Sequence, residues 1–470
     1  MPSPQRRRRR WRRVLAWVAG MVVLALVGGA AAAYRIGRLD DWFGDDDNLP
    51  PLVTPVPGFT PPTVPTAPTV ARAAPSPRPQ SACVRRSLAK AVRDPHLADL
   101  RAVVAGLTGP PVLDLGHGTS TPASTLKLLT AAAALHVLGP DRTFATRVVA
   151  DGRRRIVLVG GGDPFLAGQQ PTEGVARHDA SLQTLAALTA HRLHEQGVRT
   201  VQVAYDTSLF TGPRVNPHWR KSYIPDDVVS PITALWADEG LKPTGYGRVP
   251  DPPATAAALF ASYLHKRGIE VRQGIFEQKA RAGAREIATV TSPPVADIVE
   301  RVLQYSDNEG AEVLAHQVGL AVEGEASYNG GVRGVRSTMR GLGIDLHDAT
   351  IQDGSGLSRH DRLDAESLVE VLQLASAPGR PELRSVITGL PVAAYDGSLG
   401  YRYDASPGRG LVRAKTGTLT GTSALAGITT DARGRVLVFA FVSNHVKEAE
   451  TLDTRSALER LTSALATSNC

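Results

Sequence analysis

The sequence has 470 residues, 42% of them apolar, which suffices for one large domain or for two to three ordinary ones. Seven arginines between Arg6 and Arg13 supply most of the net charge of +8, so the rest of the chain is almost neutral and offers no nucleic-acid surface. Two cysteines exclude a disulfide-rich scaffold and a zinc site built from cysteines.

Residues 1–34 have the composition of a membrane anchor. The basic stretch 1–13 precedes the mostly apolar, uncharged stretch 14–34, which as a helix of about 30 Å would cross a bilayer. The positive-inside rule then predicts that 1–13 is cytoplasmic, that 14–34 is a single-pass transmembrane anchor in the cell membrane, and that the remainder is extracytoplasmic. The alternative is a signal peptide cleaved near the small residues 30–33, which would give a secreted protein.

Residues 35–81 are unsuited to a packed core, because eleven prolines lie between Pro50 and Pro79. This composition predicts a disordered, semi-extended linker.

The globular part is expected to begin near residue 82. Pro122 opens a run of good helix formers that stops at Gly139-Pro140, which predicts one buried helix. Before it, the pattern predicts a short helix and two strands, at 87–93, 101–105 and 111–114.

From residue 151 to residue 286 the rhythm of the sequence predicts a separate, inserted α/β domain. Strands are expected at 155–159 and 200–204, and helices at 179–196 and 254–267. The glycines at 160–162 are interpreted as a turn, because no helix that begins with Lys-Ser/Thr follows them.

After residue 287 the chain is expected to complete the domain that begins at residue 82. An antiparallel sheet with helices on its faces is the natural packing for such elements, so the predicted fold class is α/β (α+β). Helices are expected at 295–304, from about 309 onward and at 449–466. Strands are expected at 411–418, 424–429 and 435–443.

Ser124 and Lys127 are a candidate nucleophile and base. They are three residues apart and share one face of the first turn of the helix that Pro122 opens. Leucines flank the lysine, and desolvation lowers the pKa of an amine toward neutrality. The pair alone proves little, since about one Ser-x-x-Lys is expected by chance and Ser87 and Lys90 form a second copy.

Two later motifs change the odds. They are Ser306-Asp307-Asn308, at the end of the helix over 295–304, and Lys415-Thr416-Gly417, in the strand over 411–418. A decoy Ser-x-Asn occurs at Ser327-Tyr328-Asn329, but Lys-Thr-Gly occurs once. In this order the three motifs form the set of penicillin-recognising serine enzymes.

The surrounding sequence resembles the D-Ala-D-Ala carboxypeptidase/endopeptidase family (serine peptidase family S13), the class C low-molecular-mass penicillin-binding proteins. The resemblance implies a transpeptidase-like catalytic domain, 82–150 and 287–470, interrupted by the inserted domain 151–286, which is short for the two inserted domains of typical members. The resemblance extends from about residue 82 to the C-terminus. It rests on the motifs Pro-Ala-Ser-Thr-Leu-Lys, Gly-Gly-Gly-Asp-Pro, Asp-Gly-Ser-Gly-Leu-Ser-Arg and Ala-Lys-Thr-Gly-Thr-Leu.

The resemblance implies a penicillin-sensitive serine D-Ala-D-Ala carboxypeptidase, with endopeptidase cleavage left open. Its substrates would be peptidoglycan stem peptides, its covalent inhibitors β-lactam antibiotics, and it would need no metal or cofactor. Ser124 would attack the carbonyl of the penultimate D-Ala and Lys127 would take its proton. Ser306 and Lys415 would relay that proton to the departing D-Ala.

The remaining motif residues are expected to bind substrate. Asn308 would hold a substrate amide and Lys127, and the backbone N–H groups of Ser124 and Thr418 would form an oxyanion hole. The two lysines are expected to lower each other's pKa by repulsion of like charge. Thr416, Gly417, Thr418 and Asp307 are the expected substrate-binding residues. Asp307 is also expected to shape its loop.

Two other functions fit part of the pattern. A β-lactamase would share the three motifs, and the run from Glu325 to Asn329 matches its Glu-x-x-x-Asn signature, but Ser124 and Ser306 are 182 residues apart, much farther than in that family. A catalytically silent peptidoglycan-binding scaffold is the second alternative, and the intact motifs argue against it.

In the family's fold the first and last helices pack on the same sheet, so the resemblance allows a disulfide between Cys83 and Cys470 in an exported protein. Two unrelated thiols are the alternative.

Overall fold

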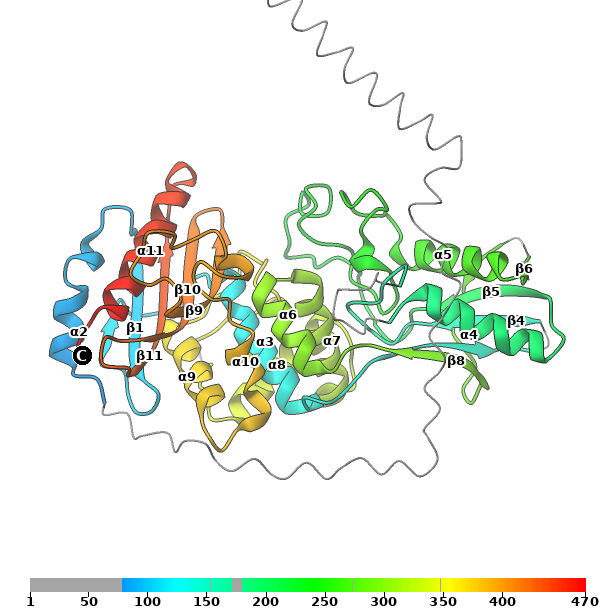
Figure 1. Cartoon of the computed structure of the whole chain (residues 1–470), viewed down its shortest axis with the longest axis horizontal. Coiled ribbons are helices and arrows are strands. Elements are labelled where there is room, and N and C mark those ends of the chain that lie inside the picture. Colours follow the sequence, from blue (N-terminus) through cyan, green and yellow to red (C-terminus); the bar gives the residue numbers. More distant parts are fainter. Residues whose placement is uncertain (1–77, 153, 171–179, 273, 347) are drawn as a thin grey trace, which may run out of the picture. The chain divides into compact units, whose positions relative to one another are not determined.

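Two sheets organise the chain in the computed structural model, which describes residues 78–152, 154–170, 180–272, 274–346 and 348–470 (Figure 1). The first sheet is antiparallel with strand order β2-β1-β11-β10-β9, and its strands are Leu113–Leu115, Leu100–Gly106, Val436–Asn444, Thr422–Thr430 and Val412–Leu419. The expected cytoplasmic segment 1–13, the anchor 14–34 and most of the linker 35–81 lie outside the described residues.

Period-two alternation in β11 shows how the first sheet is buried on both faces. Leu437, Phe439 and Phe441 pack on one side with α2 (Ser81–Leu88) and α11 (Thr451–Ala466). Val438, Ala440 and Val442 face the opposite core. The helices of that opposite core are α3 (Lys127–Leu138), α6 (Val295–Tyr305), α7 (Asn308–Glu323), α8 (Tyr328–Gly341), α9 (Ala365–Ser376) and α10 (Ser385–Thr388).

Helix α3 is buried in this core because its middle is built from four consecutive alanines, 131–134. Small side chains let α7, α8 and α9 approach its axis closely. The helix expected from Pro122 begins as a 3₁₀ turn, Ala123–Leu126, and becomes α-helical at Lys127. No helix in the described part of the chain is both long enough and apolar enough to cross a membrane.

The second sheet is mixed and carries strand order β6-β5-β4-β3-β8, with β7 also paired to β5. Two helices, α4 (Leu182–Glu195) and α5 (Pro252–Lys266), contribute apolar side chains to its core. In the same order its strands are Glu270–Val271, Thr200–Asp206, Arg155–Val159, Ala145–Ala150 and Glu286–Thr291, with β7 at Phe276–Glu277.

The second sheet extends beyond the expected limits of the insertion, 151 and 286, and these limits stay a prediction. Strand β3 pairs with β4 on one side and with β8 on the other, so the strands of the second sheet extend from Ala145 to Thr291 along the chain. An alternating pattern such as Ala-Thr-Arg-Val-Val-Ala predicts a half-buried strand but does not tell which sheet it joins. Between β5 and α5, residues 207–251 form an irregular connection with a single 3₁₀ turn, Asp238–Gly240.

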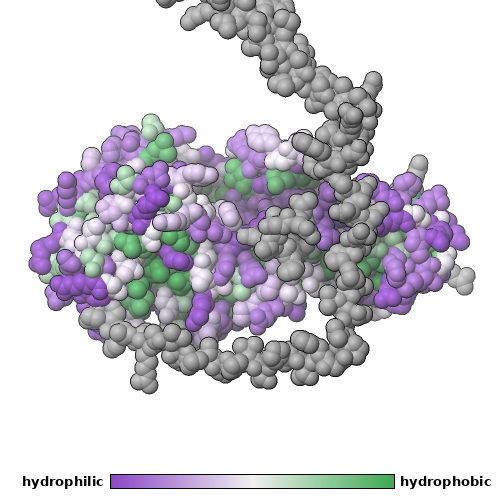
Figure 2. Space-filling view, in the orientation of Figure 1, coloured by the Kyte–Doolittle hydropathy of each residue, from purple (hydrophilic) through white to green (hydrophobic). Residues whose placement is uncertain are grey.

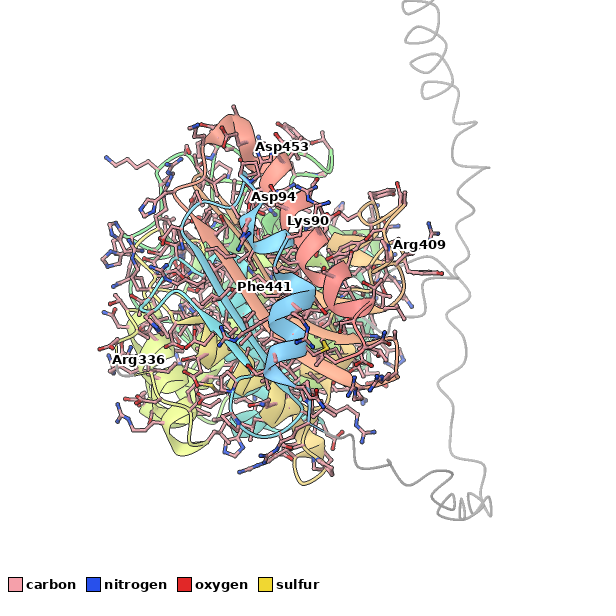
Figure 3. The ribbon with its side chains drawn as sticks, turned by 90° about the vertical axis from the view of Figure 1, so that its left-hand side faces the viewer. Lys90, Asp94, Arg336, Arg409, Phe441 and Asp453 are labelled. Atoms are coloured by element: carbon pink, nitrogen blue, oxygen red, sulfur yellow. A yellow bond between two sulfur atoms is a disulfide. The ribbon has the colours of Figure 1, made fainter. Side chains whose placement is uncertain are left out.

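The first and last helices of the described chain lie side by side on one face of the first sheet (Figure 3). Cys83 of α2 and Cys470 are joined by a disulfide, with 5.2 Å between their Cα atoms, which confirms the expected bond and rules out two free thiols. The backbone N–H of Gln80 also donates to the carbonyl oxygen of Cys470 at 3.1 Å, so the end of the expected linker is already part of the fold.

The surface of the described part of the chain is mostly polar. Figure 2 shows hydrophilic residues over most of the visible face, with a smaller apolar group at the end that holds the first sheet. Large apolar side chains that are well exposed are single residues such as Leu452, at the start of α11.

Because the disulfide closes a loop of 387 residues, breaking it should lower the free energy of unfolding by about 2–5 kcal/mol through the entropy gained by the unfolded chain. We expect Cys83→Ser to lower the urea midpoint relative to Ser87→Ala, which removes only a hydroxyl 3.5 Å from the Cys470 sulfur. Two titratable thiols in the native, unreduced protein would contradict the bond.

Candidate active site

Ser124 lies in a tight turn that two glycines allow. Ala123, just before it, has a positive φ of 49°, a conformation that costs energy for a residue with a side chain. A Cβ on Gly356 would lie 2.0 Å from the carbonyl oxygen of Ala123, and a Cβ on Gly417 would lie 2.8 Å from that of Pro122. The backbone of the loop after Asp353 and that of strand β9 therefore pack directly against the backbone of this turn. This packing fixes the position of Ser124.

The Lys127 amine is fully buried and has three oxygen partners. It lies 3.1 Å from Ser124 Oγ, 2.8 Å from Asn308 Oδ1 and 2.7 Å from the carbonyl oxygen of Ser355. As an ammonium it donates to all three. After losing one proton it keeps two N–H groups, which the two carbonyl-type oxygens retain because they can only accept. The lone pair then faces the Ser124 hydroxyl, which can donate.

Burial is the main reason that this amine can lose its proton. Desolvation lowers the pKa of Lys127 to about 8, although the negative charges of Asp353 and Glu312 oppose the shift. Burial also lowers the pKa of Lys415 well below its ordinary value, with the charge of Lys127 as the second cause. The expected repulsion between the lysines is thus present at Lys415, but it is smaller than desolvation.

Ser306 and Lys415 form the second serine–lysine pair of the site. Ser306 caps the C-terminus of α6 in the left-handed conformation, with φ 61°. Its hydroxyl accepts a hydrogen bond of 2.7 Å from the Lys415 amine, which also donates to the carbonyl oxygen of Thr416 at 2.8 Å. This contact joins the end of α6 to strand β9, which is far from it in the sequence.

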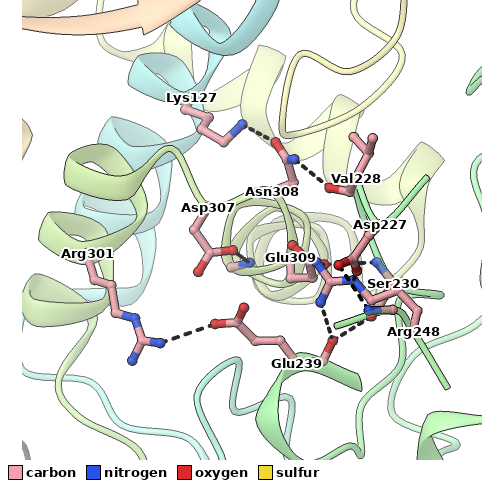
Figure 4. Close-up of polar contacts among 12 residues, drawn as sticks. Lys127, Asp227, Val228, Ser230, Glu239, Arg248, Arg301, Asp307, Asn308 and Glu309 are labelled. Carbon is pink, nitrogen blue, oxygen red and sulfur yellow. Dashed lines mark hydrogen bonds and ion pairs between the residues drawn. The ribbon is translucent and has the colours of Figure 1, made fainter. Parts of the chain in front are cut away.

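Asn308 and Asp307 begin helix α7 and have different roles (Figure 4). Asn308 Oδ1 accepts from Lys127, as expected, and Nδ2 donates to the carbonyl oxygen of Val228 at 2.9 Å. Asp307 is the N-cap of α7, since its Oδ1 accepts from the backbone N–H of Gly310 at 2.9 Å. The loop-shaping role of Asp307 therefore has a structural basis, and its contact with substrate stays a prediction.

Strand β9 brings Thr416, Gly417 and Thr418 beside the Ser124 turn. Gly417 is buried against Pro122 and Ala123, where a side chain would force the strand away. Thr416 Oγ1 donates to the hydroxyl of Ser398 at 2.9 Å. The sequence did not point to Ser398, because the turn Gly397–Leu399 belongs to none of the three motifs.

Glu312 is a further buried residue of the site that motif analysis did not assign. Its carboxylate accepts from the backbone N–H groups of Gly354 and Ser355, at 3.1 and 2.8 Å, and so orients the Ser355 carbonyl. Burial, followed by the charge of Asp353, raises the pKa of Glu312 to about 8. Asp353 itself accepts from Gly356, Ser358 and Trp219, so it organises the loop.

The decoy motifs have structural roles. Ser87 lies near the disulfide on the opposite side of the first sheet from α3, and Lys90 is exposed (Figure 3). Ser327 is the N-cap of α8, where its hydroxyl accepts from Gly330 at 3.0 Å.

One carboxylate cluster among the described residues has the spacing of a metal site. Single oxygens of Glu239, Asp307 and Glu309 lie within 4.8 Å of one another. Arg301 pairs with Glu239 at 3.4 Å and Arg248 with Glu309 at 2.8 Å, so the cluster is part of an ion-pair network.

Comparisons with known proteins agree with this geometry. The family model "D-Ala-D-Ala carboxypeptidase 3 (S13) family" matches residues 84–246 and 242–465. A carboxypeptidase of Mycobacterium tuberculosis is 35% identical over 93% of this chain and 94% of its own length. The carboxypeptidase DacB of Mycolicibacterium smegmatis is 34% identical over 98% and 99%.

The fold is shared with a solved structure. Penicillin-binding protein 4 of Haemophilus influenzae superposes with a TM-score of 0.68 at 22% identity, covering 82% of this chain and 98% of that protein. With a family model that matches most of the described chain and relatives above 30% identity over nearly all of it, the protein belongs to the D-Ala-D-Ala carboxypeptidase 3 (S13) family.

Proposed function

We propose that this protein, a penicillin-sensitive serine-type D-Ala-D-Ala carboxypeptidase acting on peptidoglycan, works through an acyl-enzyme on Ser124. The observation that carries the assignment is the buried Lys127 amine, 3.1 Å from Ser124 Oγ and held by two oxygens that can only accept. A buried amine whose pKa is lowered to about 8, and whose lone pair in the neutral form faces a hydroxyl, can act as the base that nucleophilic catalysis by serine requires.

In the acylation step, Ser124 Oγ bonds to the carbonyl carbon of the penultimate D-Ala while Lys127 takes the hydroxyl proton. The oxyanion that forms is held by the backbone N–H groups of Ser124 and Thr418, which contribute a few kcal/mol each. The C–N bond then breaks, and the departing nitrogen receives its proton through Ser306 and Lys415, whose contact of 2.7 Å supports this relay. Water then attacks the ester carbonyl, and the bond from this carbon to Ser124 Oγ breaks. The water oxygen leaves in the product carboxylate, one water proton restores the Ser124 hydroxyl, and the other goes to the solvent.

The terminal carboxylate of the substrate would lie along β9. Thr416 and Thr418 offer hydroxyls, and Lys415 supplies positive charge. The hydrogen bond from Thr416 to Ser398 restricts the rotation of that hydroxyl and supports Ser398 as its orienting partner. Whether the leaving group is free D-Ala or a cross-linked amino-acid centre depends on how much room this side of the site provides.

We further propose that the catalytic part is held outside the cell membrane by residues 14–34. Twenty-one uncharged residues after an arginine cluster support a signal-anchor with the N-terminus in the cytoplasm. The disulfide between Cys83 and Cys470 supports an oxidising, extracytoplasmic location. Loss of the segment by signal cleavage would leave a secreted form.

The β-lactamase alternative requires a carboxylate that activates water near the acyl-enzyme. Glu325 is half-buried and pairs with Arg333, and it follows the C-terminal end of α7, whereas Asn308 at the N-terminal end contacts Lys127. A helix of 16 residues is about 24 Å long, so Glu325 is remote from Ser124.

Replacement of Ser124 tests the nucleophile. We expect Ser124→Ala to abolish covalent labelling by a fluorescent penicillin, because among the described residues Ser124 provides the hydroxyl that the Lys127 amine contacts. Ser87→Ala, which alters the decoy motif, should be labelled like the wild type. Labelling that survives in Ser124→Ala would refute the assignment, and an unlabelled wild type would refute the function.

The pH dependence of acylation tests the base. Because Lys127 must be neutral and its pKa is about 8, the second-order rate of penicillin acylation should rise through pH 8 and level off above it. The protonated amine has no lone pair, so the rate falls as the pH drops below this value. Lys127→Arg, which stays charged, should remain inactive across the range. A rate independent of pH between 6 and about 10 would exclude Lys127 as the base.

The lifetime of the adduct tests the β-lactamase alternative. The opened ring of penicillin stays attached and obstructs water, and a missing general base typically costs about 10²- to 10⁴-fold in rate. We expect D-Ala release from D-Ala-D-Ala peptides, but a penicillin adduct that persists for minutes in intact-mass measurements after excess drug is removed. Recovery of the unmodified mass within seconds would favour a β-lactamase.

A further inference from the structure

The orientation of the Asn308 amide is determined by the inserted region. Val228, in the irregular connection between β5 and α5, offers a carbonyl oxygen 2.9 Å from Asn308 Nδ2 (Figure 4). A carbonyl can only accept, so the amide must turn its N–H end toward Val228 and its oxygen toward Lys127. With the opposite orientation, Lys127 would lose one of the two acceptors that direct its lone pair at Ser124.

Arg248 holds this carbonyl in place. Its Nε lies 2.8 Å from Asp227 Oδ1, and its Nη2 lies 2.8 Å from Glu309 Oε1. Asp227 immediately precedes Val228, and Glu309 immediately follows Asn308. One guanidinium thus forms ion pairs with two residues. One is next to Asn308, the donor of the hydrogen bond, and the other is next to Val228, its acceptor.

The surrounding contacts fix both carboxylates. Asp227 has a positive φ of 61°, and its Oδ2 accepts from the backbone N–H of Gly247 at 3.1 Å. Glu309 Oε1 also accepts from the backbone N–H of Ser230 at 2.9 Å. The Arg248 and Glu309 side chains are only 9% and 4% exposed, so solvent screens their pairing little.

We propose that Arg248 is a positioning residue for acylation, which clamps Asp227 onto Glu309 and thereby fixes the Asn308 amide and the direction of the Lys127 lone pair. The proposal rests on the proposed function, in which Lys127 is the base. It makes the insertion a working part of the active site, because neither Val228 nor Arg248 belongs to the serine, Ser-x-Asn or Lys-Thr-Gly motifs.

A purely structural ion pair would have a different signature. Buried ion pairs contribute little net stability compared with apolar replacements, and removing one partner mainly leaves an unpaired charge. Arg214 provides a matched control within the insertion, since it also bridges two carboxylates, Asp251 at 3.2 Å and Glu277 at 3.3 Å. Its guanidinium contacts neither Asp227 nor Glu309.

The experiment compares penicillin acylation of the full chain in Arg248→Met, Arg248→Lys, Asp227→Asn and Arg214→Met. Rates are measured over a range of drug concentrations, to separate the half-saturating concentration from the maximal acylation rate. We expect Arg248→Met to lower the maximal rate about 10- to 100-fold, the scale of a small misplacement of a reacting group, with little change in half-saturation. Arg214→Met should acylate like the wild type.

Arg248→Lys should fall between the wild type and Arg248→Met, because an ammonium cannot bridge two carboxylates as a planar fork does. Burial raises the pKa of Glu309 to about 7, so in Arg248→Met this carboxyl can take up a proton instead of remaining an unpaired charge. If Arg248→Met still yields no folded protein, Asp227→Asn decides, since it releases Val228 while Arg248 and Glu309 stay paired; it should also lower the maximal rate.

A wild-type maximal rate in folded Arg248→Met or Asp227→Asn would overturn the proposal. An equal loss of maximal rate in Arg214→Met would also overturn it, as would an effect of Arg248→Met on the half-saturating drug concentration alone. Failure of the proposed function is distinguishable, because the wild type itself would then not be labelled at Ser124.

Discussion

The site depends on the buried Lys127 amine, which must lose its proton and direct its lone pair at the Ser124 hydroxyl. Burial lowers the pKa of Lys127 to about 8 and so makes the neutral form accessible, but a buried amine without partners would be costly, so its two N–H groups need acceptors. Asn308 and the Ser355 carbonyl meet this need and leave a single direction for the lone pair. Each acceptor then requires its own support, which Val228 gives to Asn308 and Glu312 gives to the loop of Ser355.

The same constraint explains why the insertion packs where it does. Trp219 donates to Asp353 at 2.8 Å, and Tyr223 donates to the carbonyl oxygen of Leu357 at 3.3 Å, so the irregular connection also braces the loop that carries Ser355. Trp219 and Tyr223 belong to one apolar cluster with side chains of α7, α8 and this loop. Both acceptors of Lys127 therefore rest on the same stretch of the insertion.

Sequence analysis could identify residues whose chemistry is tied to a motif, and it could not identify those that act through backbone atoms. Ser124, Lys127, Ser306, Asn308 and Lys415 are brought together as the motif order predicted. Val228 and Ser355 contribute carbonyl oxygens, which any residue could supply, so their side chains carry no signal. Glu312 and Arg248 act through their side chains, but both lie outside the three motifs.

The fold shows a similar division. Strand β4 was predicted with its observed limits, because its apolar run is short, rich in β-branched residues and followed directly by glycines. The sheet that β3 and β8 join could not be predicted because strand partners are long-range, and the irregular stretch 207–251 has no periodicity from which to predict its path. This stretch contacts α7, α8 and the loop after Asp353.

The disulfide has a mechanical consequence. Load applied to the chain before residue 78 reaches α2 and divides at Cys83, where one branch continues along the backbone to β1 and the other crosses to Cys470 and α11. α11 in turn follows β11, which pairs with β1 along seven residues in the middle of the first sheet. Tension would be shared by two neighbouring central strands, so the sheet is loaded along its strands and its edge strands β2 and β9 are not peeled away. The Lys-Thr-Gly motif lies on β9, outside that path.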